Sequence, residues 1–162
     1  MASLGKDWEK KFKEDWKNQF PEGDILRLQD AMSGYKLTSQ NPCDFICFAD
    51  RKQFMVECKE TNGNTLNFHK IHQLDDLLTH TGKPYIYPGV LVWFSDHDVI
   101  YWVDAIYIKK MIEAGKKSIH VSMLDAENKY KILNLTGKVN RVFVTGDYKK
   151  LVEREDQIWY IV

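Results

Sequence analysis

Large apolar residues recur at every fourth position near the start of the chain. Four aromatic residues share this spacing: Trp8, Phe12, Trp16 and Phe20. Residues four apart lie on one face of an α-helix, so the pattern predicts an amphipathic helix over residues 6–20 with one buried side. Pro21-Glu-Gly23 follows and is typical of a helix end.

Two apolar segments in the next part of the chain have the length of strands. Residues 44–48 and 53–59 are joined by the short link Ala49-Asp-Arg-Lys52. This arrangement predicts a β-hairpin. Residues 24–40, ahead of it, have weak periodicity, and we expect a strand-like or irregular excursion there.

Helical and strand-like patterns alternate further along. Residues 69–80 carry Ile and Leu at helical spacing and are followed by Gly82 and Pro84, which predicts a helix. Two strands are expected over residues 89–94 and 99–103, separated by a polar turn.

The last third of the chain contains one more predicted helix. Asp104 is placed to cap a helix that runs to about Ala114, with Gly115 as its stop. Short strand-like pieces follow and end with residues 158–162. This order of elements predicts an α/β fold, a mixed central β-sheet flanked by helices. Since no linker-like segment interrupts the chain, we assign residues 1–162 to one domain.

The composition is that of a globular protein, with 44% hydrophobic and 13% aromatic residues. The longest apolar run, residues 89–94, is far too short to span a membrane. The first residues contain no apolar stretch that would direct secretion, so we expect a cytoplasmic protein. Cys43, Cys47 and Cys58 have no zinc-type spacing and are expected to be reduced thiols.

Basic residues gather in the second half, although the formal net charge is zero. Between residues 105 and 150 there are ten Lys or Arg against four acids. Within this region Lys109, Lys110, Lys116 and Lys117 are candidates for contacts with DNA phosphates. The alternative is an ordinary helix end, where the helix dipole favours cations.

Three polar residues on the predicted hairpin can form a catalytic centre. Side chains alternate along a strand, so Glu57 and Lys59 share one face while Cys58 points to the other. Asp44, on the neighbouring strand, can place its carboxylate beside Glu57. Two close carboxylates repel each other unless a cation lies between them, and oxygen ligands suit Mg²⁺, for which Mn²⁺ can substitute. Lys59 would then stabilise charge that develops on a phosphate. The alternative is a solvated strand face.

The sequence around these residues resembles a known family. Three runs carry the resemblance: Asn41-Pro-Cys-Asp44-Phe-Ile, Phe54-Met-Val-Glu57-Cys-Lys59-Glu-Thr61 and Ile71-His-Gln73. They are similar to the RecU-like Holliday junction resolvases of bacteria and phages, in the PD-(D/E)xK nuclease superfamily. The resemblance implies a restriction-endonuclease-like α/β core and a Mg²⁺-dependent endonuclease that cuts four-way DNA junctions in recombination and repair. It also implies a homodimer, with one centre for each cut strand, and products with 5′-phosphate and 3′-hydroxyl ends.

The resemblance also implies roles for individual residues. Asp44 and Glu57 would be metal ligands, Lys59 the transition-state stabiliser, Gln73 a further metal-site residue and Glu9 an outer contributor. Other interpretations stay open for the last two. Gln73 can be an exposed helix glutamine, and Glu9 can pair with the lysine four residues further on.

The chain departs from the family pattern in two places. Pro42 stands where the family commonly has a Thr in the metal site, so water or the Cys58 carbonyl would complete the metal shell. Residues 24–40 fall where the family has a stalk that enters the junction, and whether they form one is left open. Two other functions fit the same residues. One is another superfamily endonuclease, of restriction or flap type, and the other is a non-catalytic DNA-binding phage-type protein whose site has decayed.

Overall fold

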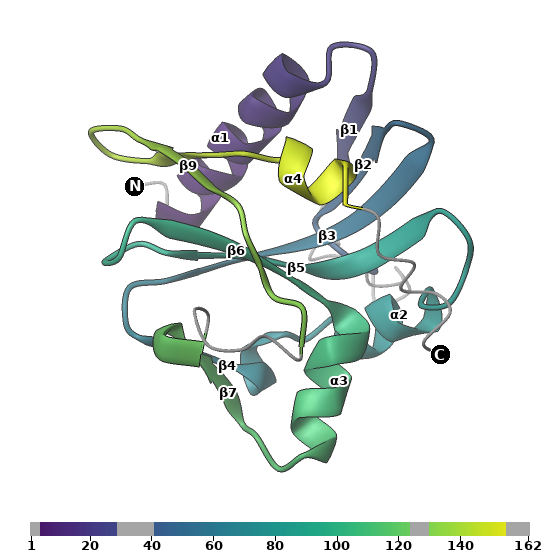
Figure 1. Cartoon of the computed structure of the whole chain (residues 1–162), viewed down its shortest axis with the longest axis vertical. Helices are drawn as coiled ribbons and strands as arrows, with labels where there is room; N and C mark the ends of the chain where they lie inside the picture. Colours follow the sequence, from purple (N-terminus) through teal and green to yellow (C-terminus); the bar gives the residue numbers. More distant parts are fainter. Residues whose placement is uncertain (1–3, 29–40, 124–129, 155–162) are drawn as a thin grey trace, which may run out of the picture.

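A computed structural model of the chain describes residues 4–28, 41–123 and 130–154. Its centre is a six-stranded sheet with the strand order β1-β2-β3-β5-β6-β8 (Figure 1). β3 and β5 are parallel and the other neighbours are antiparallel, so the sheet is mixed. Its strands are β1 (Asp24–Arg27), β2 (Phe45–Ala49), β3 (Lys52–Thr61), β5 (Ile86–Phe94), β6 (Val99–Asp104) and β8 (Leu133–Asn134).

Helices cover both faces of this sheet. α1 (Leu4–Gln19) and the short α4 (Lys149–Val152) lie on one face, and α2 (Leu74–Thr79) and α3 (Ala105–Glu113) lie on the other (Figure 1). The predicted fold class, an α/β fold with a mixed central sheet flanked by helices, is confirmed. None of the described helices is both long and apolar enough to cross a membrane. The assignment of the whole chain to one domain stays a prediction.

α1 confirms the helix that the aromatic spacing predicts. Trp8, Phe12 and Trp16 are buried, and each is at most 1% exposed. The Phe12 ring packs edge-on against Phe45 of β2 at 5.3 Å, and Trp16 packs against Phe54 of β3 at 5.7 Å. The helix therefore covers the sheet face to which Phe45 and Phe54 point.

β2 and β3 form the predicted hairpin. Their register runs from the pair Phe45 and Val56 to the pair Ala49 and Lys52. The turn residues Asp50 and Arg51 have φ values of 48° and 63°. Two successive left-handed residues are the conformation of a type I′ turn, whose twist matches that of the strands it joins.

The single helix predicted over residues 69–80 is wrong, because the connection from β3 to β5 consists of several short elements. This connection contains three short elements, β4 (Thr65–Asn67), the 3₁₀ helix η1 (Phe68–Lys70) and α2, and β4 pairs with β7 (Ser118–His120) from later in the chain. Ile71 has φ −92° and ψ 78°, which is not helical, so a single helix does not form. The Phe68 N–H donates to the Lys117 carbonyl at 3.0 Å, so contacts with a distant strand hold the start of this segment away from a helical path.

α3 begins and ends close to the predicted positions, and Gly115 has the φ of 87° expected of a helix stop. Asp104 occupies the N-cap position, but its side chain makes no capping hydrogen bond. Its carboxylate instead accepts hydrogen bonds from Trp102 Nε1 at 2.9 Å and from Arg154 at 2.8 and 2.9 Å. The predicted side-chain cap is therefore wrong, because buried donors bind the same oxygens.

The described C-terminal part contains short strands, as predicted. It also contains a short helix, α4, that the sequence pattern did not predict. The elements after β7 are the 3₁₀ helix η2 (Val121–Met123), β8, β9 (Thr136–Val139), β10 (Val144–Gly146) and α4. Tyr148 precedes α4 and packs against Phe12 at 5.0 Å, which ties this part to α1. The strand expected over residues 158–162 lies outside the described residues.

Candidate metal centre at the open end of the hairpin

Asp44 lies one residue before β2 and beside Glu57 of β3. The register pairs Phe45 with Val56, so the next pair outward joins Asp44 and Glu57. The Asp44 N–H donates to the Val56 carbonyl at 3.0 Å, and Asp44 Oδ2 accepts a hydrogen bond from the Cys58 N–H at 2.9 Å. These two bonds hold the Asp44 carboxylate against the strand that carries Glu57.

The Glu57 carboxylate is buried where its charge is poorly solvated. The side chain is 1% exposed, and its Oε2 atom has no hydrogen-bond partner. Burial, together with the hydrogen bond to Asp44 and the negative charge of Asp44, raises the pKa of Glu57 to about 9. A divalent cation between the two carboxylates would remove this penalty, so the site fits a metal ion.

Lys59 shares the strand face of Glu57. Its Nζ atom is 4.0 Å from Glu57 Oε2, and its side chain keeps 24% exposure. The β5 residues paired with Glu57 and Lys59 are Val90 and Val92, which are fully buried and form an apolar wall along the pair. The structure thus brings Asp44, Glu57 and Lys59 together, as the hypothesis of a catalytic centre requires.

Arg27 of β1 connects Glu9 of α1 to the backbone at Asp44. Its Nε atom is 3.3 Å from Glu9 Oε2, and its Nη1 atom donates to the Asp44 carbonyl at 3.5 Å. The guanidinium also lies 5.5 Å from the centre of the Phe45 ring. Glu9 is close enough for its charge to contribute to the raised pKa of Glu57. The sequence pattern did not single out Arg27, because 18 residues separate it from Glu9.

Gln73 stands at the N-cap position of α2 and is half-buried. Its backbone carbonyl accepts the Leu77 N–H at 2.9 Å, and a role for its side chain at the metal stays a prediction. Within the described ranges no three His, Cys, Asp or Glu side chains gather at one point. Asp44 and Glu57 would therefore hold a cation together with amide, carbonyl or water oxygens, a donor set that suits Mg²⁺.

The lysines predicted to contact DNA lie on and after α3. Lys109 Nζ is 3.9 Å from Glu113 one turn further on, and Lys110 Nζ lies 5.2 Å from the centre of the Tyr107 ring. The other two, Lys116 and Lys117, are exposed beyond the helix end. Their contact with DNA stays a prediction, and two of the four make interactions within their own helix.

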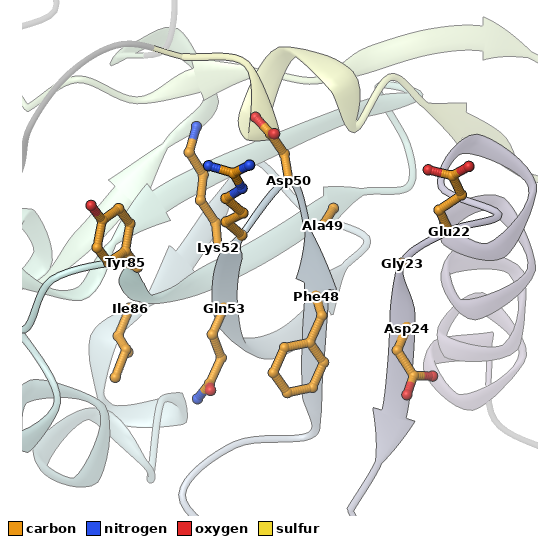
Figure 2. A pocket seen from close by; sticks show the side chains of 11 residues that line it. Glu22, Gly23, Asp24, Phe48, Ala49, Asp50, Lys52, Gln53, Tyr85 and Ile86 are labelled. Atoms are coloured by element: carbon orange, nitrogen blue, oxygen red, sulfur yellow. The ribbon is translucent and has the colours of Figure 1, made fainter.

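A cavity of about 660 Å³ lies at the turn end of the hairpin (Figure 2). The register of β2 and β3 puts Asp44 at the opposite end of the hairpin. Asp24, Phe48 and Gln53 point to one side of the strands that line it, whereas Lys52 points to the other (Figure 2). The three candidate catalytic residues are not among those that line it. This cavity is therefore not the candidate centre, although it is large and open.

The fold and the site together define a class, the mixed-sheet α/β proteins in which two carboxylates and a lysine lie together at the open end of a β-hairpin. Residues 26–143 match the family described as RecU, Recombination protein U. The chain belongs to this family of Holliday junction resolvases, which confirms the resemblance found in the sequence. It is accordingly a nuclease that acts on branched DNA in recombination.

One solved structure with similarity to the chain is that of Hjc, a Holliday junction resolvase from the archaeal hyperthermophile Archaeoglobus fulgidus. It is 16% identical, with a TM-score of 0.40, and the match covers 77% of this chain and 87% of that one. Comparison with curated proteins gave no match.

Proposed function

We propose that this chain resolves four-way DNA junctions by hydrolysis that depends on Mg²⁺, or on Mn²⁺ in its place. One observation carries the proposal. The buried Glu57 carboxylate has an oxygen without a hydrogen-bond partner, beside Asp44 and 4.0 Å from Lys59 Nζ. Membership of the RecU family supports the choice of branched DNA as the substrate.

Asp44 and Glu57 would hold the cation, with Gln73 as a third protein ligand. Asp44, directly before β2, is held by hydrogen bonds to the strand β3 that carries Glu57, so the ligands are preorganised. Bound there, the cation would polarise the scissile phosphate and make a water molecule more acidic. Arg27 would keep Glu9 and the Asp44 backbone in position through the contacts at 3.3 and 3.5 Å.

Lys59 would stabilise the negative charge that develops on the phosphate. Its ammonium lies next to the carboxylate pair, and its 24% exposure leaves it accessible to a strand of DNA. An ammonium placed beside the reacting phosphorus acts where charge appears in the transition state, so it lowers the barrier and not only the dissociation constant.

We infer that the active form is a homodimer in the cytoplasm. Each chain carries one centre, and resolution of a junction requires a cut in each of two opposed strands. Two copies related by a twofold axis would supply these two cuts, since twofold symmetry is the commonest arrangement of homo-oligomers.

A cleavage gel tests the proposed function. A four-way junction, a linear duplex and a flapped duplex are incubated with the protein, with Mg²⁺ and with a chelator. We expect Mg²⁺-dependent cutting of the four-way junction, with Asp44→Asn unable to cut while it still binds. Preferred cutting of linear or flapped DNA would favour a restriction- or flap-type enzyme. Binding without any cutting would favour a non-catalytic DNA-binding protein.

A further inference from the structure

A row of lysines runs along the exposed side of α1. The members of this lysine stripe are Lys6, Lys10, Lys13 and Lys17. Spacings of four, three and four residues place side chains one above another on a helix, so the four ammonium groups share a narrow strip. All are exposed except Lys13, which is half-buried. The aromatic residues of α1 face the sheet instead, so the stripe is turned away from the core.

The lysine stripe borders a groove of about 260 Å³ beside β1. The groove is lined by Lys6, Glu9, Lys10, Lys13, Arg27 and Phe45. Its single acid, Glu9, lies 3.3 Å from Arg27, so four cations outweigh one carboxylate there. Arg27, which lines the groove, lies 3.5 Å from the Asp44 carbonyl, so the groove is at the same end of the sheet as the candidate metal centre. The groove lies on the sheet face that α1 covers, and Glu57 and Lys59 point to the other face.

The stability of the helix explains this arrangement only in part, since Asp7, Glu9 and Glu14 stand three or four residues from lysines of the stripe. Like charges three or four residues apart repel one another and lower the stability of a helix. The remaining lysine of α1 shows the structural alternative, because Lys11 bonds to the buried Asp15 and lies 3.2 Å from Thr145 Oγ1. One lysine of α1 thus serves packing, while the four lysines of the stripe lie along one side of the helix, where their charges repel one another.

We propose that the lysine stripe and Arg27 hold the phosphate backbone of DNA on its approach to the metal centre, an inference that rests on the proposed function. The buried carboxylates repel DNA, and the chain has no net charge to attract it, so a local cationic surface is needed. The stripe is about 16 Å long at 1.5 Å per residue, close to the rise of about five nucleotides in one strand of a duplex. Lysines bind phosphates without reading bases, which suits recognition of DNA structure over sequence.

The test compares two triple variants with the same change in charge. The stripe variant is Lys6→Gln, Lys10→Gln and Lys13→Gln, and the control is Lys138→Gln, Lys149→Gln and Lys150→Gln, at exposed positions of β9 and α4. Binding of a fluorescent four-way junction is measured by anisotropy with a chelator present, between about 50 and 200 mM salt. Each lost phosphate contact reduces the slope of log affinity against log salt by about 0.9. We expect the slope of the stripe variant to fall by about two to three and its affinity to fall at least about tenfold, with the control unchanged.

An unchanged slope in the stripe variant, or an equal loss in both variants, would overturn the proposal. Thermal unfolding verifies that the variants fold. If the stripe variant does not, the single change Lys10→Glu at an exposed position gives the same readout. With Mg²⁺ the stripe variant should show a raised KM and a kcat within about twofold of wild type, because its lysines act in binding.

The outcomes separate this inference from the proposed function. If the wild-type protein cuts junctions and the stripe variant binds them as tightly as wild type, DNA binding by the lysine stripe is refuted. The proposed resolvase activity then still holds. If the wild-type protein binds junctions without cutting them and the stripe variant no longer binds, the proposed resolvase activity is refuted. The proposal that the lysine stripe binds DNA then still holds.

Discussion

Glu57 is held in a state that disfavours its ionised form. The side chain is 1% exposed, lies beside Asp44, and has one oxygen without a hydrogen-bond partner. Its pKa is raised from 4.5 to about 9, mainly by burial and then by Asp44. Such a residue lowers stability, and carboxylates with a raised pKa of this kind are common at functional sites.

The substitution Glu57→Gln should therefore stabilise the metal-free protein while it abolishes cleavage. Above pH 4.5 the unfolded chain ionises Glu57 while the folded chain keeps the proton, because the pKa in the fold is about 9. Stability is therefore lost as the pH rises between these two values. Thermal unfolding with a chelator should show a gain in Tm for Glu57→Gln that is absent near pH 4 and grows toward pH 9. A loss of Tm throughout that range would contradict the burial of an unfavourable carboxylate.

Lys59 should act on the rate of cleavage and not on binding. Lys59→Ala is expected to lower kcat by about 10²–10³-fold, the usual effect of removing one group that stabilises transition-state charge. Junction affinity should change by less than about threefold, since one exposed phosphate contact contributes little. Single-turnover cleavage and anisotropy measure the two effects, with the exposed Lys70→Ala as control. A loss of affinity that matches the loss of rate would show that Lys59 only holds the DNA.

At the level of elements, the turn between β2 and β3 is strained, and we expect this strain to have no role in the candidate metal centre. Arg51 has a φ of 63°, a conformation that costs a non-glycine residue about 1 kcal/mol or more. Arg51→Gly should raise the free energy of unfolding by about 0.5 kcal/mol after the entropy lost by glycine is included. Cleavage should stay unchanged, because the turn lies at the opposite end of the hairpin from Asp44. Urea unfolding checks this against Arg51→Ala, which removes the same charge, keeps a Cβ and should bring no gain.

Local patterns were sufficient to predict α1, the hairpin and the meeting of Asp44 with Glu57. Each follows from a repeat of two or four residues, which determines the face to which a side chain points. Contacts between distant segments were not predictable in this way. The pairing of β4 with β7 fixes the chain directly before the helix predicted over residues 69–80, and Arg27 reaches Glu9 across 18 residues. For the same reason the sequence does not predict that the Asp104 side chain binds Arg154, 50 residues further on, and makes no capping hydrogen bond to α3.

For the whole molecule, the Asp104–Arg154 ion pair fastens the C-terminal part to the central sheet. Arg154 follows α4, and its guanidinium makes two bonds to Asp104 at the end of β6, at 2.9 and 2.8 Å. Their side chains are 3% and 5% exposed, so neither charge is solvated by water. Lys52 of β3 also donates to the Val152 carbonyl, which adds a second tie at the same end of the sheet.

Removing one partner of this pair should destabilise the entire fold. Arg154→Met leaves Asp104 buried and unpaired, and such a change costs about 3–5 kcal/mol. Arg154→Met combined with Asp104→Asn should recover much of that loss, because no uncompensated charge remains. The same replacement at the exposed Arg141 should change the free energy of unfolding by less than about 0.5 kcal/mol. Urea unfolding of the wild-type protein, Arg154→Met, Asp104→Asn and the double variant gives the coupling energy directly. Additive effects of the two changes would mean that the pair does not hold the C-terminal part in place.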